Sequence, residues 1–143
     1  RQMCIRDRFC ANNQIGITCM IDGSALRFMD DNDIYCLFGN ILDNAIEAVL
    51  KLKDTSRRQI NLTMGKREEL LFLRIENYFE NQLSFVNGLL QTTKADEKYH
   101  GFGLKSISLV TQKYGGNVSI STQGTPPEQT FCLNIFFSGK DLK

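Results

Sequence analysis

The amino-acid sequence predicts a two-layer α/β sandwich, in which helices cover one face of a mixed, largely antiparallel sheet. The chain has 143 residues, enough for one domain with a hydrophobic core. Hydrophobic residues make up 42% and charged residues 23% of the chain, close to globular averages, which argues against disorder or a repeat array. The hydrophobic patterns follow the order β, α, β, β, α, β, β, which is typical of helices packed on an open sheet.

The first half of the chain contains a strand, a long helix and a hairpin. The strand, residues 15–21, is rich in β-branched side chains and ends at an Asp-Gly turn. The helix, residues 33–53, has no proline, carries polar side chains at helical spacing and follows a run of acidic N-cap residues. The hairpin strands, residues 59–65 and 70–77, are joined by the charged turn 66–69.

The second half contains a less regular segment, a second helix and a second hairpin. We expect a short helix at 82–90, followed by a polar and mobile stretch at 91–100. The second helix, residues 104–114, is closed by two glycines, because glycine adopts the left-handed conformation that ends many helices. The last strands, 118–122 and 130–137, alternate as paired strands do.

The charge and the apolar runs exclude two classes of protein. Lys and Arg number 17 against 16 Asp and Glu, a net charge of +1, so no overall attraction to nucleic acid or to an anionic membrane is expected. No apolar run approaches the ~18 residues that a membrane helix requires. Residues 1–8 fit none of the predicted elements, and we expect a non-native or disordered leader there, before a domain of residues 9–143.

The cysteines indicate a reducing compartment. They are odd in number, widely spaced and without a C-x-x-C pair, which predicts reduced thiols in a cytoplasmic setting. Cys19 and Cys132 lie in apolar runs and are expected to be small core residues.

The long helix has a narrow polar stripe. From Asp30 to Leu50 there are five acidic residues and no Lys or Arg, a local charge of −5. Two carboxamides lie four residues apart on one face, and their oxygens are hard, neutral ligands of the type that Mg²⁺ accepts. The helix is expected to be mostly buried, with its stripe bordering a polar groove or, equally well, solvent. The stripe consists of Asn40, Asp43, Asn44, Glu47 and Lys51.

Two glycines lead into the second helix, in the segment His100-Gly101-Phe102-Gly103-Leu104-Lys105-Ser106. Glycine lets the backbone approach a ligand closely, and the free N–H groups at a helix N-terminus bind anions, which a lysine can reinforce. The segment is neither a Walker loop nor a dinucleotide fingerprint, because the spacing of its glycines differs from both. An ordinary loop-to-helix turn is the alternative interpretation.

The two motifs in this order resemble the GHKL ATP-binding fold of gyrase, heat-shock chaperones, histidine kinases and mismatch-repair ATPases. Residues 39–48 (GNILDNAIEA) resemble the asparagine box, and residues 100–107 (HGFGLKSI) the lid glycine box, of quorum-sensing histidine kinases of the accessory-gene-regulator type. The resemblance runs from about Cys10 to Phe137. It implies a Bergerat-type domain that binds ATP and Mg²⁺ and donates the γ-phosphate to a histidine on a separate domain.

The resemblance also implies roles for individual residues. Asn44 is the magnesium ligand, and Asn40, its neighbour near the phosphates, is a second candidate ligand; both are the catalytic candidates. ATP-hydrolysing relatives have a glutamate at the position of Asn40, and a carboxamide cannot act as a general base, which favours phosphoryl transfer over hydrolysis. Asn77 stands at the adenine-binding aspartate, in a segment without the usual glycines. The other nucleotide-binding candidates are Asp43, Lys94, His100, Gly101, Phe102, Gly103, Leu104, Lys105 and Thr130.

Further partners follow from the resemblance. They are an upstream dimerisation domain with the acceptor histidine, a downstream response regulator and a membrane-embedded sensor. His100 is the only histidine and belongs to the lid, so this chain by itself is not expected to autophosphorylate. Two alternatives stay open: an anti-sigma-type serine kinase, against which Asn77-Tyr78-Phe79 argues, and a nucleotide-dead docking module, which the altered adenine box permits.

Overall fold

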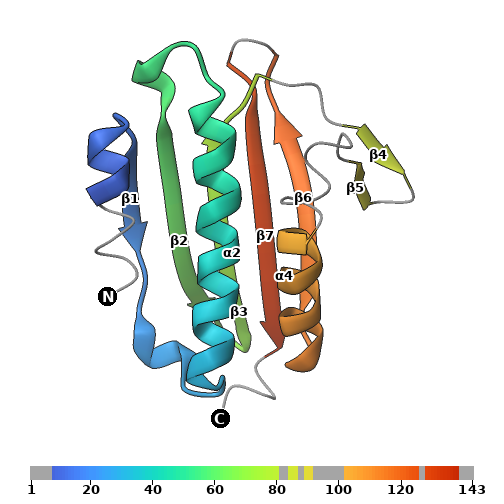
Figure 1. The fold of residues 1–143 in the computed structure, drawn as a ribbon. Coiled ribbons are helices and arrows are strands. Elements are labelled where there is room, and N and C mark those ends of the chain that lie inside the picture. Colours follow the sequence, from blue (N-terminus) through green and yellow to red (C-terminus); the bar gives the residue numbers. More distant parts are fainter. Residues whose placement is uncertain (1–7, 81–83, 87–88, 92–101, 126–127, 139–143) are drawn as a thin grey trace.

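The computed structural model describes residues 8–80, 84–86, 89–91, 102–125 and 128–138. In this part of the chain, two long helices lie on one face of a sheet (Figure 1). No helix in these ranges is long and apolar enough to cross a membrane. The elements are β1 (Gly16–Met20), α2 (Asp31–Leu50), β2 (Gln59–Arg67), β3 (Leu70–Tyr78), β4 (Ser84–Val86), β5 (Leu89–Gln91), α4 (Phe102–Lys113), β6 (Asn117–Gln123) and β7 (Thr130–Ser138).

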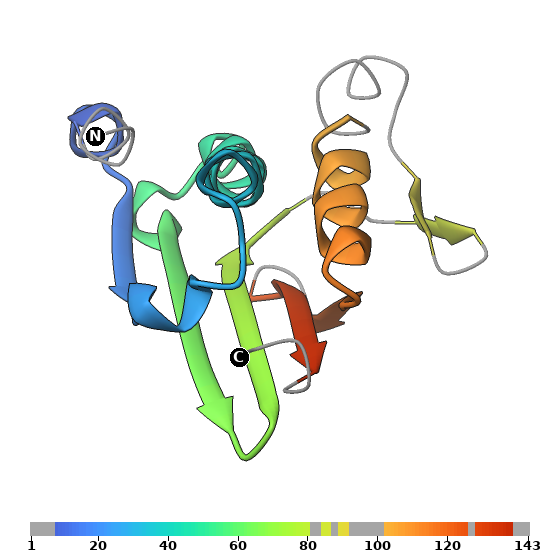
Figure 2. The ribbon, with the colours of Figure 1, turned by 90° about the horizontal axis from the view of Figure 1, so that it is seen from below.

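The main sheet has five strands in the order β1-β2-β3-β7-β6. β1 is parallel to β2, and the other neighbours are antiparallel. Seen along the sheet, both helices lie on the same side of it (Figure 2). The predicted two-layer α/β sandwich with a mixed, largely antiparallel sheet is therefore confirmed.

The core lies between the helices and the sheet. Along β3, Leu71, Leu73 and Ile75 are buried and alternate with half-buried residues on the other face, as the period of two in a strand requires. The helix α2 contributes Leu37, Ile41, Leu42, Ala45, Ile46 and Val49. Each large side chain of this kind contributes roughly 1.5–3 kcal/mol when buried. The helix is buried along this one face, and residues such as Asp31, Tyr35 and Asp43 are exposed, so the prediction that most of it is buried holds only for this face.

The helix α4 ends in a glycine pair, as predicted. Gly115 has a φ of 72°, and the N–H of Gly116 donates to the carbonyl of Thr111 at 2.9 Å, the pattern of a Schellman motif. Gly116 is also tightly packed, because an added Cβ would lie 2.6 Å from the carbonyl oxygen of Phe136 and 2.7 Å from the Phe137 ring. The chain therefore needs glycine at both positions, for different reasons.

We expect Gly116→Ala to lower the free energy of unfolding by about 1–3 kcal/mol, because the added methyl group overlaps backbone and a buried ring. Urea unfolding followed by circular dichroism measures this loss. Gly23→Ala is the matched control, since no atom lies within 4 Å of a Cβ added there. Equal stabilities of the two variants would show that the chain adjusts around Gly116 without cost.

A polar cluster joins the start of α2 to the end of α4. The Tyr114 hydroxyl donates to Asp33 Oδ2 at 2.5 Å, and Lys113 Nζ lies 2.8 Å from the same oxygen. These two groups hold the pKa of Asp33 below its usual value, and Asp33 in turn raises the pKa values of Lys113 and Tyr114. The Tyr114 ring packs edge-on against Phe28 with centroids 5.7 Å apart. We call Asp30, Asp33, Lys113 and Tyr114 the helix-end cluster.

Two sequence predictions are wrong. The expected helix at 82–90 is an antiparallel hairpin of β4 and β5, in which Ser84 pairs with Gln91 and Val86 with Leu89. The Asn-Gly pair in the sequence between these strands is a strong hairpin signal that outweighs the apolar run. Cys132 is buried as expected, but Cys19 is exposed, because it lies in the second half of an edge strand that has a sheet neighbour on one side only. The stretch expected to be mobile, 91–100, lies outside the described residues from residue 92 onward.

Candidate functional site

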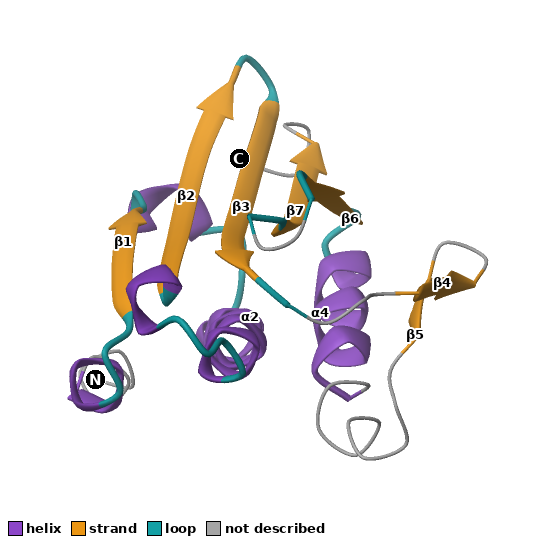
Figure 3. Ribbon diagram, turned by 90° about the horizontal axis from the view of Figure 1, so that it is seen from above, coloured by secondary structure: helices purple, strands orange, loops and turns teal. Residues whose placement is uncertain are grey.

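The candidate site is built from α2, the start of α4, and the strand ends where β3 finishes and β7 begins. The two helices pack side by side, and the first turn of α4 lies beside the middle of α2 (Figures 1 and 3). Below them, Asn77 of β3 pairs with Phe131 of β7, and Tyr78 pairs with Thr130. The register therefore places Asn77 and Phe131 side by side on the helix-covered face of the sheet, with Thr130, the residue before Phe131 in β7, on the alternate face.

The asparagines of α2 differ in their surroundings. Asn40 Nδ2 donates to the Cys36 carbonyl at 2.8 Å, one helical turn back, so the amide nitrogen is engaged and the amide oxygen is left for a ligand. Asn44 is half-buried, and its side chain makes no hydrogen bond to any residue that the structure describes. A half-buried carboxamide with no partner among the described residues is a candidate for contact with a ligand. Asp43, beside it, is exposed.

Asn77 is a buried polar residue near the end of β3, on the sheet side of the candidate site. Its side chain is only 3% exposed, and its Nδ2 donates to the Tyr78 carbonyl at 2.9 Å. Burying an amide is costly unless its polar atoms find partners, and this bond occupies a single one of its donors. The amide oxygen remains to accept a hydrogen bond from a bound molecule, which is the role expected for it.

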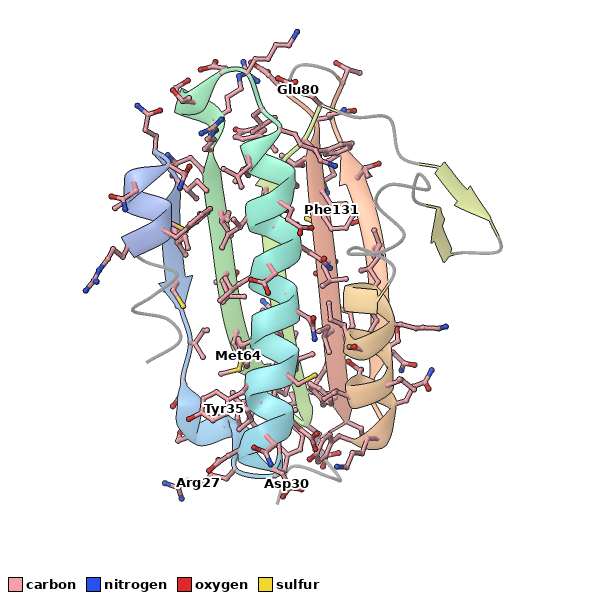
Figure 4. The ribbon with its side chains drawn as sticks, viewed as in Figure 1. Arg27, Asp30, Tyr35, Met64, Glu80 and Phe131 are labelled. Atoms are coloured by element: carbon pink, nitrogen blue, oxygen red, sulfur yellow. The ribbon has the colours of Figure 1, made fainter. Side chains whose placement is uncertain are left out.

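An aromatic pair beside Asn77 was not predicted from the sequence. Phe79 and Phe131 pack edge to face, with ring centroids 6.4 Å apart. Phe131 points into the region between α2 and the start of α4 (Figure 4). An aromatic face at this place offers a planar apolar ligand a surface for stacking. The signal in the sequence was weak, because the proximity of the two phenylalanines depends on the β3–β7 register.

The start of α4 is the candidate anion-binding end of the site. The helix begins at Phe102, two residues earlier than predicted, so Gly103 belongs to its first turn. Free N–H groups and the positive end of the helix dipole lie there. Leu104 is half-buried and Lys105 is exposed in the same turn. The predicted site residues Lys94, His100 and Gly101 lie outside the described part of the chain, as does the side chain of Phe102.

The sequence matches the family model of the GHKL domain over residues 29–138. The chain belongs to the GHKL domain family. The match covers both motifs and the helix-end cluster as well as the sheet from β2 to β7. The expected family is therefore confirmed. Among curated proteins, none matches the sequence.

Solved structures of similar fold include three histidine kinases. Acinetobacter baumannii histidine kinase AdeS has a TM-score of 0.63 and 15% identity, over 95% of this chain and 59% of that chain. The mycobacterial sensor histidine kinase MprB has a TM-score of 0.60 and 14% identity, over 92% and 89%. The catalytic domain of histidine kinase ThkA has a TM-score of 0.64 and 15% identity, over 94% and 86%. This GHKL domain thus has the fold of histidine kinase catalytic domains and spans 59% of the AdeS chain.

Proposed function

We propose that this GHKL domain binds Mg-ATP and serves as the catalytic domain of a sensor histidine kinase of the accessory-gene-regulator, quorum-sensing type. The observation that carries the proposal is the combination of three features: the Asn44 carboxamide, which has no hydrogen-bond partner among the described residues, the buried Asn77 amide and the N-terminus of α4. They suit, respectively, a hydrated cation, a base with an exocyclic amine, and phosphate groups. ATP with Mg²⁺ combines all three in one ligand.

The proposed roles follow from the chemistry of each group. Asn77 Oδ1 accepts a hydrogen bond from the adenine amine, with Phe131 beside the base and Thr130 at the strand end. The N–H groups at the start of α4 bind phosphate oxygens, aided by Lys105 and, from the lid, Lys94, His100 and Gly101. Asn44, with Asn40 as a second ligand, holds Mg²⁺, which when bound neutralises charge on the phosphate oxygens.

Asn40 favours transfer of the phosphoryl group over hydrolysis. A carboxamide has no basic lone pair at neutral pH that could remove a proton from water, and its nitrogen is already hydrogen-bonded to Cys36. An imidazole nitrogen needs no such base, because it is a nucleophile at neutral pH. We therefore propose that an acceptor histidine on an upstream dimerisation domain attacks the γ-phosphorus, and that ADP leaves.

The test has two steps. Calorimetric titration of the purified chain with Mg-ATP is expected to give saturable heat, and its absence at millimolar nucleotide would favour a docking module. Adding a helical hairpin from an accessory-gene-regulator-type kinase, with radiolabelled ATP, is expected to label that hairpin. A hairpin with its acceptor histidine changed to alanine is the control. Labelling of a serine, which survives acid whereas phosphohistidine does not, would instead favour the anti-sigma-type kinase.

The setting of the domain is part of the proposal. A kinase of this type passes its phosphoryl group on to a response regulator and is anchored in the bacterial membrane, with the catalytic domain in the cytoplasm. Labelling of the hairpin followed by loss of that label to a co-expressed response regulator would support the two-component assignment. A hairpin that keeps its label with every regulator from the same genome would contradict it.

A further inference from the structure

The helix-end cluster lies at the opposite end of the helices from Asn77 and from the start of α4. Figure 4 shows Asp30 at the foot of α2 and Glu80, just beyond β3, at the far end. Within the cluster, the Tyr114 hydroxyl donates to Asp33 Oδ2 at 2.5 Å and accepts the Asp30 N–H at 3.0 Å. One hydroxyl group therefore joins the end of α4 to both the N-cap and the first turn of α2.

The burial of α4 is concentrated near its C-terminal end. Ile107 and Thr111 are 0% and 1% exposed, and Val110 is 8% exposed. In the first turn, Leu104 is half-buried and Lys105 is exposed. The helix is thus anchored by Ile107, Val110 and Thr111 and by Tyr114, which follows it, and its first turn is the end farthest from Tyr114.

A small rotation of α4 about its C-terminal end would produce a large displacement of its first turn. A helix of 12 residues is about 18 Å long at 1.5 Å per residue, so a rotation of roughly 10° about its C-terminal end moves its first turn by about 3 Å. Binding groups need to be held within about 0.5 Å of their working geometry. A small loss of constraint at Tyr114 therefore becomes a large displacement at the phosphate-binding turn.

We propose that Tyr114, acting through Asp33 and Asp30, is a positioning residue for the phosphate end of the nucleotide site. The inference rests on the proposed function, because it assigns the start of α4 to the phosphates. Tyr114 itself touches no part of the site. Its hydroxyl fixes the angle of α4 against α2, and so the distance between the first turn of α4 and the asparagines of α2.

The adenine end of the candidate site provides an internal control for the effect of Tyr114 on the phosphate end. Asn77, Thr130 and Phe131 are on sheet strands, and their register does not depend on α4. Adenosine, which lacks phosphates, is therefore expected to bind independently of the Tyr114 hydroxyl. A merely destabilised domain would instead lose affinity for adenosine and ATP alike.

The test compares Tyr114→Phe with the wild-type chain. This variant keeps the ring on Phe28 and removes only the hydroxyl. Titrations with adenosine and with Mg-ATP are expected to give an unchanged Kd for adenosine and a Kd for Mg-ATP raised about 3–10-fold, the range for losing one or two hydrogen bonds. Tyr35→Phe is the matched control, since Tyr35 is an exposed tyrosine on α2 outside the cluster.

Other results would overturn the inference or the function beneath it. An unchanged Kd for Mg-ATP, or equal losses for both ligands in folded protein, would overturn the role of Tyr114. Wild-type protein that binds neither ligand would instead contradict the proposed function. Asp33→Asn provides a second route if Tyr114→Phe does not fold, and the same split between adenosine and Mg-ATP is expected of it. In the double variant the losses are expected to be non-additive, because both changes break one contact.

Discussion

Replacing Asn44 with alanine is expected to weaken Mg-ATP binding by about 10- to 100-fold, while ATP binding in EDTA changes by no more than about twofold. The size of the effect is that of a hydrogen-bonding or coordinating contact to a charged partner, about 1.5–3 kcal/mol. The dependence on metal is the decisive part, because the carboxamide oxygen can coordinate a cation but cannot donate a hydrogen bond to a phosphate oxygen. No rearrangement of the fold is expected, since Asn44 makes no hydrogen bond to any described residue.

Calorimetric titrations with ATP in Mg²⁺ and in EDTA measure this difference directly. Asn32→Ala, an exposed asparagine in the first turn of the same helix, is the matched control and is expected to leave both affinities unchanged. Equal losses in the two conditions would remove Asn44 from the metal role and leave it as a packing residue. A larger loss for Asn40→Ala than for Asn44→Ala would exchange their roles as first and second ligand.

Most of the fold follows from local patterns, because the elements of the core have strong periodicity. The strands β2, β3 and β7 show alternating apolar residues, and α2 shows an apolar stripe at helical spacing. These are the patterns expected of elements with one buried face. The hairpin of β4 and β5 differs from the predicted helix, because a short apolar run fits both periods and the Asn-Gly pair favours the hairpin. The exposure of Cys19 depends on β1 being an edge strand, and strand order is not a local property.

The residues of the candidate site are of two kinds: those that local sequence patterns indicate, and those whose position depends on contacts between distant parts of the chain. The sequence indicates Asn40, Asn44 and Asn77 as candidates, because the motifs that contain them are local. It gives no such signal for Phe131, because the position of Phe131 beside Asn77 comes from pairing between strands that are far apart in the chain. Tyr114 and Asp33, 81 residues apart, carry no signal in the sequence that connects them. Contacts of this kind depend on the packing of α4 against α2, which only the folded chain defines.

Arg58 is expected to have the largest single effect on stability among the polar residues. Its Nη1 donates to the Asn13 carbonyl at 2.8 Å, and its Nη2 donates to the carbonyls of Leu50 and Leu52 at 3.3 Å each. The carbonyl of Arg58 in turn accepts the Gly16 N–H at 2.8 Å. The Arg58 side chain therefore provides hydrogen-bond donors for the carbonyls at the end of α2. It also links this end to the segment before β1, at the edge of the sheet.

We expect Arg58→Leu to lower the free energy of unfolding by about 2–4 kcal/mol, because the variant leaves several partly buried carbonyls without donors. Arg58→Lys is expected to lose most of the same stability, since one ammonium group cannot reproduce the guanidinium fork that reaches carbonyls on two segments. Urea unfolding measures both losses, provided that the m-value, the slope of the unfolding free energy against urea concentration, is the same in all variants. Arg67→Leu, at the exposed end of β2, is the control and is expected to stay within about 0.5 kcal/mol of wild type. If Arg58→Lys matched the wild type, a single charge near the end of α2 would be enough, and the helix dipole would replace the fork as the reason for an arginine at this position.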